Sequence, residues 1–317
     1  MTTRRPDDGV EGSRWMLGGA RAAGTFLTDR RTGFLLVVPA AIVLLAFAVY
    51  PFFVAAYDSL FEVDLINRTR TFTGLGNYEQ LVTDPAVHMA LVRSVIWTSA
   101  NVVIQLIVGL AIALVLDAKL RGQSLARSLV LFPYMVPAAV VALAFRFLFN
   151  DVTGIVNHLM LESGIIDKPI SFLSSTSTVL WTLIVVNSWK YVPFMVIVLL
   201  ARLHTVPNDL YDAANIDGAG RWAAFRHVTL PWLMPVLIIA VLLRTIWAAY
   251  DFDVPYLLAQ GGPLSATTTL PIQIRALAFE RQDIGLASAL AVAVALILLV
   301  ASFFYLRAYR SSEERLN

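Results

Sequence analysis

Long apolar stretches alternate with shorter polar segments along the chain. Six stretches are built mainly from Val, Ile, Leu, Ala and Phe. A helix needs about 20 apolar residues to cross a bilayer core of about 30 Å, and each stretch meets that length. They run from Gly33 to Tyr57, Ser94 to Leu116, Leu125 to Phe149, Thr178 to Ala201, Leu230 to Tyr250 and Ile284 to Leu306. The pattern therefore predicts six membrane-spanning segments.

These stretches are too long for strands, and helices satisfy their own backbone groups in lipid. We therefore predict an all-α integral membrane protein with six transmembrane helices. Pro133 and Pro137 come early in the third stretch and predict a kink near its cytoplasmic side. The first stretch could instead be a signal peptide, but its apolar run is longer than about 7–15 residues and follows a polar arm.

Basic residues are distributed unevenly among the segments that connect these stretches. Fifteen lie in the N-terminal arm, the second and fourth connecting segments and the tail, namely Arg4, Arg5, Arg14, Arg21, Arg30, Arg31, Lys119, Arg121, Arg127, Arg202, Arg221, Arg226, Arg307, Arg310 and Arg315. Five lie in the alternate segments, namely Arg68, Arg70, Lys168, Arg275 and Arg281. Because cytoplasmic segments are enriched in Lys and Arg, both termini are predicted to be cytoplasmic. The predicted parts are a cytoplasmic arm (1–32), a membrane domain (33–309) and a cytoplasmic tail (310–317).

Composition agrees with a membrane protein and excludes several kinds of chemistry. Of the 317 residues 58% are hydrophobic and only 15% are charged, where soluble domains carry about 25% charged residues. The chain has no cysteine, which excludes a thiol nucleophile, a disulfide scaffold and a Cys-ligated metal. A net charge of +2 does not indicate a nucleic-acid partner.

The residues that catalysis or ion coupling would need are also missing from the six stretches. The three lysines, Lys119, Lys168 and Lys190, do not follow a glycine, so the chain has no phosphate-binding P-loop. Carboxylates are absent from the interior of every stretch, and only Asp251 comes close, at the outer end of the fifth. The four histidines fall in the connecting segments, without metalloprotease spacing. We therefore predict no catalytic residue, no metal site and no ion-coupled carrier.

The most informative segment is the cytoplasmic loop 207–235. Asn208 or Asp209 can cap a short helix that ends at Gly218. The apolar side of this helix would carry Leu210, Ala213, Ala214 and Ile216. A second amphipathic piece then follows, with Trp222, Phe225 and Val228 on one side and Arg221 and Arg226 on the other, and it ends where Leu230-Pro231 opens the fifth stretch. Two short helices at a bend could form a docking knob or lie on the lipid surface.

The order of residues in this loop resembles the EAA loop of binding-protein-dependent ABC importer permeases. The resemblance rests on Asp212-Ala213-Ala214, Asp217-Gly218-Ala219, Phe225, Leu230, Pro231 and Pro235. It implies that loop 202–229 is a coupling helix that fits a cleft on a cytoplasmic ATPase subunit. The implied docking residues are Tyr211, Asp212, Ala213, Ala214, Asp217, Gly218, Ala219 and Phe225. One departure is Asp212, which stands where the family usually has Glu.

Three further stretches resemble the carbohydrate, maltose-permease branch of that family. They are Gly76-Asn77-Tyr78, Pro133 to Phe149 with Gly154 and Asn157, and Gly261-Gly262-Pro263 with Thr267 to Leu270. The resemblance covers about residues 33–310 and implies the ABC importer permease fold in a bacterial cytoplasmic membrane, with a sugar as substrate. The implied partners are a second permease subunit, more often unlike than identical, two ATPase subunits that bind ATP and Mg, and an extracytoplasmic solute-binding protein. No cofactor is implied in this chain.

Two polar and aromatic stripes are candidates for the substrate path. In the fourth stretch Asn187, Lys190, Tyr191 and Phe194 fall at i, i+3, i+4 and i+7, and in the fifth Arg244, Trp247 and Asp251 have similar spacing. Amides, charges and aromatic faces suit a sugar, and the family resemblance also points to these two spans. The alternative is structural, because Lys190 and Arg244 could pair with Asp251 or with a second permease, and the rings could form interface belts.

Two further interpretations remain open. The first is an ABC permease for another solute: Lys190 and Arg244 would also suit a phosphorylated polyol, and a polyamine or an amino acid are further possible substrates. The second is an ATP-independent carrier or channel.

In the second stretch, Trp97, Asn101 and Gln105 repeat every four residues and predict hydrogen bonds between helices.

Overall fold

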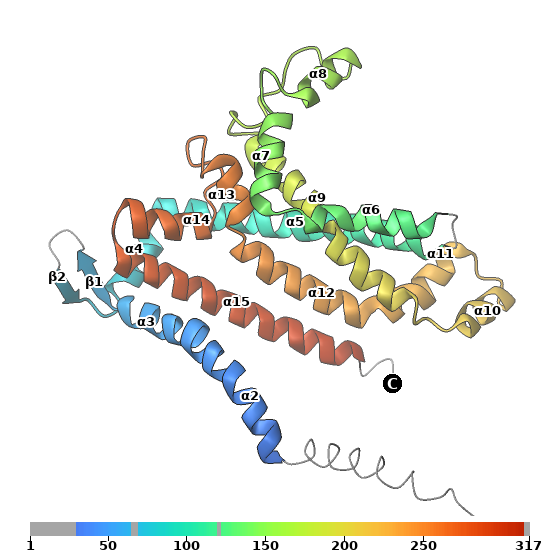
Figure 1. Ribbon diagram of the computed structural model, residues 1–317, viewed down its shortest axis with the longest axis horizontal. Coiled ribbons are helices and arrows are strands. Elements are labelled where there is room, and N and C mark those ends of the chain that lie inside the picture. The colour runs from blue at the N-terminus through green and yellow to red at the C-terminus, as the bar shows by residue number, and fades with distance from the viewer. Residues whose placement is uncertain (1–29, 65–68, 119–121, 314–317) are drawn as a thin grey trace, which may run out of the picture. The chain divides into compact units, whose positions relative to one another are not determined.

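The computed structural model describes residues 30–64, 69–118 and 122–313, and it consists mostly of helices (Figure 1). It divides into two units, residues 1–57 and 58–317. In the first unit, α2 (Arg30–Leu44) continues through a π-helical turn (Leu45–Val49) into α3 (Tyr50–Asp58). The apolar segment Leu36–Asp58 is long enough to cross a membrane, which agrees with the first predicted span. The predicted arm lies largely outside the described residues.

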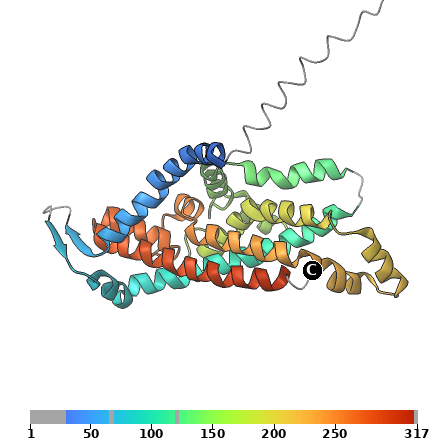
Figure 2. The same cartoon turned by 90° about the horizontal axis from the view of Figure 1, so that it is seen from below.

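Four long helices form the framework of the second unit. They are α5 (Pro85–Asp117), α9 (Val179–Leu203), α12 (Leu230–Tyr250) and α15 (Ile284–Glu313). In Figures 1 and 2 they run alongside one another, with α5 packed on α9 and α12, and α12 on α15. The bounds of α12 agree with the fifth predicted span, whereas α5 begins at Pro85 rather than Ser94, so His88 lies inside it.

Glycine allows α5 and α9 to approach closely. A Cβ atom added at Gly109 of α5 would lie 2.5 Å from the Cβ of Met195 on α9, where Met195 is fully buried. No real pair of carbon atoms packs this closely without a shift of the backbone. Small residues at such crossings are how membrane helices gain van der Waals contact, since lipid offers no hydrophobic driving force.

The third predicted span is broken into two helices. They are α6 (Gln123–Met135) and α7 (Ala138–Leu148), which meet at an angle of 95°. Val136 is extended (φ −74°, ψ 128°), because a residue that precedes a proline is disfavoured in the helical region. The predicted kink is thus confirmed at Pro137, whereas α6 continues through Pro133. In the described residues five helices can cross a membrane, or six if this bent pair counts as one span.

The connecting segments contain one small sheet that the all-α prediction did not include. Strands β1 (Phe61–Asp64) and β2 (Thr69–Phe72) pair antiparallel, with Phe61 opposite Phe72. Short helices complete the unit: α4 (Gly76–Thr83), α8 (Ile155–Glu162), α10 (Asn208–Ile216), α11 (Arg221–Ala224), α13 (Asp253–Ala259) and α14 (Leu270–Arg275). Asn77 of α4 donates to the backbone oxygens of Ser59 (2.8 Å) and Phe61 (2.9 Å), and so fixes the hairpin.

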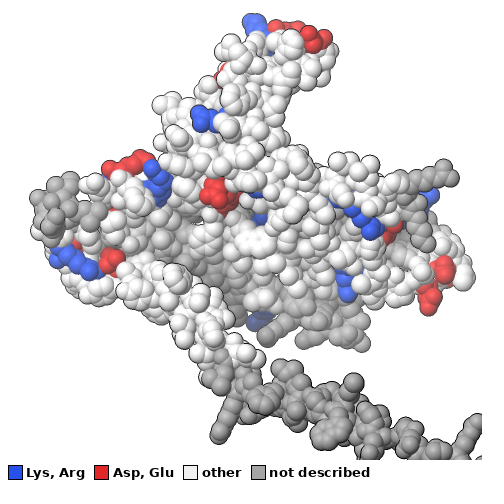
Figure 3. All heavy atoms as spheres, viewed as in Figure 1, with Lys and Arg blue, Asp and Glu red and all other residues white. Residues whose placement is uncertain are grey.

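Charged side chains are scarce along the packed helices. Figure 3 shows a largely white surface over α5, α9 and α12, with charged residues toward the ends of the helices and one group beside α13. This distribution is typical of a protein whose middle section faces hydrocarbon, because an exposed charge there costs several kcal/mol.

We expect Gly109→Leu to destabilise the protein by about 1–3 kcal/mol, since the added atoms must push α5 away from α9. The matched control is Ala111→Leu, which adds the same side chain at an exposed position of α5. Thermal unfolding in detergent should show a lower midpoint for the first variant alone. Equal midpoints would contradict the close approach of the two helices.

Candidate functional site

The first candidate site is the loop between α9 and α12, which lies at one end of the second unit (Figure 1). The predicted short helix is present as α10, but it begins at Asn208, its N-cap is Pro207 and no side chain caps it. The predicted cap by Asn208 or Asp209 is therefore wrong. Asp209 instead lies in the first turn, where a negative charge favours the helix dipole. The predicted break at Gly218 is confirmed, because this residue has φ +76° and follows the helix directly.

The second half of the loop is joined to α12 without interruption. Helix α11 continues through a π-helical turn (Phe225–Thr229) into α12. The rings of Trp222 and Phe225 stack at 5.5 Å, and the hydroxyl of Tyr211 lies 2.9 Å from that of Thr229, which ties α10 to this turn. The two short helices thus form a braced knob.

The surface of this knob is apolar and open. Ile216 is 86% exposed and Trp222 is 72% exposed, and Asp212 and Ala213 beside them are also exposed. A cavity of about 600 Å³ lies between the two halves of the loop. It is lined by Leu114, Tyr211, Asn215, Ala219, Arg221, Trp222, Ala224, Phe225 and Thr229. An exposed apolar face with a hollow is suited to contact with another protein.

The second candidate site is a cavity of about 350 Å³ where α6, α9 and the end of α12 meet. It is lined by Tyr134, Tyr191, Arg244, Trp247, Tyr250, Asp251, Phe252 and Asp253. Five of these side chains are aromatic and three are charged. Four of the seven residues of the two predicted stripes therefore share one cavity, although they come from two helices.

Arg244 is the central charge of this cavity. Only 2% of the residue is exposed, and its Nε donates to Oε1 of Gln105 on α5 at 2.6 Å. Its guanidinium lies 4.5 Å from the centre of the Tyr191 ring and 5.9 Å from that of Trp247, within the range of cation–π attraction. Its Nη2 atom is buried and has no hydrogen-bond partner among the described residues.

Asp251 is held by an amide rather than by a cation. The side-chain amide of Asn187 on α9 donates to its carboxylate. No salt bridge in the part of the chain that the structure describes joins Asp251 to Lys190 or Arg244. The alternative in which these cations pair directly with Asp251 is therefore not what the structure shows.

Three stripe residues do not line the cavity: Asn187, which holds Asp251, and Lys190 and Phe194. Lys190 donates to the backbone oxygen of Val136, at the break between α6 and α7, and its ammonium lies 5.3 Å from the Tyr191 ring. Phe194 packs edge-on against Trp247 with ring centres 5.0 Å apart. Lys190 and Phe194 thus position groups that line the cavity.

The stripe predicted in the second span forms hydrogen bonds between helices. Trp97 donates from Nε1 to the backbone oxygen of Ala248 on α12 at 3.1 Å. Gln105 joins Arg244, as described above, and its Nε2 lies 3.5 Å from Oδ1 of Asn187. Asn101 accepts from Ser188 of α9 at 3.2 Å. The predicted hydrogen bonding between α5 and its neighbours is confirmed.

Four lining residues were missed by sequence reasoning: Tyr134, Tyr250, Phe252 and Asp253. The ring of Tyr134 lies 6.0 Å from that of Tyr191, a contact between α6 and α9 that no periodicity within one helix can reveal. The other three flank Asp251, where the chain leaves α12 and enters α13. A cluster of aromatic and acidic residues at a helix end was the signal that could have found them.

Comparison with known proteins agrees with this architecture. Residues 105–317 match the family described as "Binding-protein-dependent transport system inner membrane component". The chain is 32% identical to the trehalose/maltose transport system permease protein MalF of Thermococcus litoralis over 89% of this chain and 95% of that protein. It is 33% identical to the sulfoquinovosyl glycerol transport system permease protein SmoG of Agrobacterium fabrum, over 90% of this chain and 93% of that protein.

A solved structure shows the same fold. A chain of a bacterial ABC transporter involved in the import of the acidic polysaccharide alginate superposes with a TM-score of 0.77 at 20% identity, over 92% of this chain and 99% of that one. This likeness shows the fold, and the matches above show the family. The chain belongs to the family of inner-membrane components of binding-protein-dependent transport systems.

The contact between Gln105 and Arg244 can be tested with a double-mutant cycle. We expect Gln105→Leu to destabilise the protein by about 2–3 kcal/mol, because a buried guanidinium loses its acceptor. Adding Arg244→Met should recover part of the loss, since the orphaned charge is then gone. Thermal unfolding in detergent measures both effects. Strictly additive losses would show that the two side chains do not interact.

Proposed function

We propose that this chain forms one half of the translocation pathway of an ATP-driven importer, and that its cargo is a sugar. The observation that carries the proposal is the cavity at the end of α12, where aromatic rings surround Arg244. Sugars are bound by polar groups that reach their hydroxyls and by rings that cover their apolar faces. Nη2 of Arg244 has no hydrogen-bond partner among the described residues, and a hydroxyl of the sugar would supply one.

The charges of the lining favour an uncharged sugar over a phosphorylated polyol. Arg244 faces two carboxylates, Asp251 and Asp253, across the same cavity. Lys190 is engaged at the backbone of Val136 and does not add a second cation. A phosphate group would therefore meet more negative than positive charge, whereas hydroxyl groups can use both kinds of partner.

The relatives supply the class of cargo. The permeases named above serve transport of trehalose and maltose and of sulfoquinovosyl glycerol. Their shared chemistry is a ring with many hydroxyl groups. We assign the same class of substrate to this chain, which carries no ATP-hydrolysing motif and acts as the non-catalytic transport subunit.

The orientation follows from the distribution of basic residues. Both termini and the loop that contains α10 and α11 face the cytoplasm, and the cavity lies toward the outer end of α12. The knob formed by α10 and α11 docks on an ATPase subunit through its exposed face, with Asp212 at the contact. A second permease completes the pathway, and an extracytoplasmic binding protein delivers the sugar.

We expect Tyr191→Ala to raise the KM for the sugar about tenfold, because the ring that faces Arg244 in the cavity is lost. The control is Trp181→Ala, which removes an exposed ring from the start of the same helix. The assay is ATP hydrolysis by the reconstituted importer, stimulated by the loaded binding protein. An unchanged KM would exclude Tyr191 from the substrate path while leaving the family assignment intact.

The coupling role of the loop requires a separate test. We expect Asp212→Arg to reduce co-purification with the ATPase subunits at least about tenfold, because the reversed charge faces the partner. Asp167→Arg makes the same change in an exposed segment on the predicted outer side and should have no effect. Equal recovery of ATPase with both variants would refute the docking role of Asp212.

A further inference from the structure

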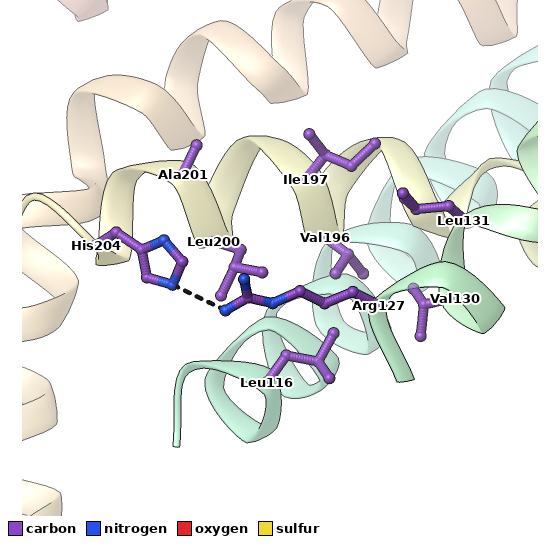
Figure 4. Close-up of a pocket in the computed structure, with 9 residues that line it drawn as sticks. All are labelled: Leu116, Arg127, Val130, Leu131, Val196, Ile197, Leu200, Ala201 and His204. Atoms are coloured by element: carbon purple, nitrogen blue, oxygen red, sulfur yellow. Dashed lines mark hydrogen bonds between the residues drawn. The ribbon is translucent and has the colours of Figure 1, made fainter. Parts of the chain in front are cut away.

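A third cavity, of about 260 Å³, lies between α5, α6 and α9 at the end that carries the loop (Figure 4). Most of its wall is apolar and is built from Leu116, Val130, Leu131, Val196, Ile197 and Leu200. Leu116, Val196 and Leu200 are buried, whereas Ile197 is 45% exposed. The cavity therefore reaches from the helix interface to the surface. It is distinct from the cavity that surrounds Arg244.

One end of this cavity carries the guanidinium of Arg127, which forms no salt bridge among the described residues. Figure 4 shows the Arg127 side chain lying along the cavity, with its guanidinium directed at His204. Nη2 of Arg127 is 3.3 Å from Nε2 of His204. A histidine ring carries no negative charge, so this contact does not neutralise the guanidinium.

The other polar groups described near Arg127 form no salt bridge with it. Asp117 lies against the same histidine nitrogen at 3.7 Å, and no salt bridge among the described residues includes Arg127. The Nε atom of Arg127 is buried and lacks a hydrogen-bond partner in the part of the chain that the structure describes. A buried, unpaired donor on a cation is costly, and an anionic ligand would remove that cost.

We propose that this cavity binds an anionic phospholipid, with its phosphate on Arg127 and part of an acyl chain along the apolar wall. The combination of an arginine that has no salt bridge among the described residues with an open apolar cavity matches the two halves of such a lipid. In the orientation proposed above, the site faces the cytoplasmic leaflet, where basic pockets between membrane helices recognise anionic headgroups. The lipid would fill the interface between α6 and α9 beside the coupling loop.

The test uses the full-length protein in detergent with added lipid, and native mass spectrometry counts the bound lipids. The two probes are phosphatidylglycerol and phosphatidylcholine with the same acyl chains. We expect Arg127→Gln to weaken binding of phosphatidylglycerol about fivefold, the effect of one basic residue, and to leave phosphatidylcholine unchanged. Arg127→Lys should retain the preference. Arg146→Gln, an exposed arginine in the last turn of α7, is the matched control and should bind as the wild type does.

A second variant tests the apolar part of the site without touching the charge. Ala201→Phe places a ring against the cavity wall and should also weaken binding of phosphatidylglycerol. The proposal fails if Arg127→Gln affects both lipids equally, if Ala201→Phe has no effect, or if millimolar inorganic phosphate alone displaces the lipid. The last result would identify a free phosphate site. These outcomes do not depend on transport and so leave the proposed function untouched.

Discussion

Arg244 carries a positive charge into the contact between three helices, and α5, α9 and α12 are arranged to accommodate it. Gln105 of α5 accepts its Nε–H, and the Tyr191 ring of α9 lies against its face. Gln105 in turn approaches Asn187, which holds Asp251 where α12 ends. Each of these polar groups would be costly to bury without a partner. The three helices are therefore placed so that most of the groups have hydrogen-bond or ring partners at the same time. The cavity is the place where this polar network meets open space.

The close packing of α5 on α9 depends on a different constraint but supports the same site. Met195 of α9 fills the space that a side chain at Gly109 would otherwise occupy. This contact brings Gln105, one helical turn earlier on α5, into reach of Asn187 and Arg244. Gly109 thus allows α5 to approach α9 closely, and the buried amide of Gln105 forms hydrogen bonds across the contact.

The sequence was sufficient where a property belongs to one helix and insufficient where it depends on several. The apolar runs predicted the bounds of α12, which depend on local length, and Pro137 predicted the break in the third span, because the residue before a proline is disfavoured in the helical region. The stripe that contains Tyr191 and the one that contains Arg244 were each visible as a spacing. Their convergence with Tyr134 was not, since α6 reaches α9 only through the packing of the second unit. The predicted cap of α10 was wrong for a local reason, because the helix begins one residue earlier and Pro207 occupies the N-cap position.

The break in the third span leaves an unequal boundary with the membrane. Helix α6 has 13 residues and α7 has 11, which correspond to lengths of about 20 Å and about 16 Å. At 95° the two lengths do not add along one direction, and neither reaches the bilayer thickness of about 30 Å. Lipid beside this pair has to thin, or another protein has to replace it, whereas lipid beside α5 or α15 meets a helix of full length. The surface that faces the bilayer is thus short beside α6 and α7 and long beside α5 and α15. A neighbouring subunit gains the most by replacing lipid beside α6 and α7.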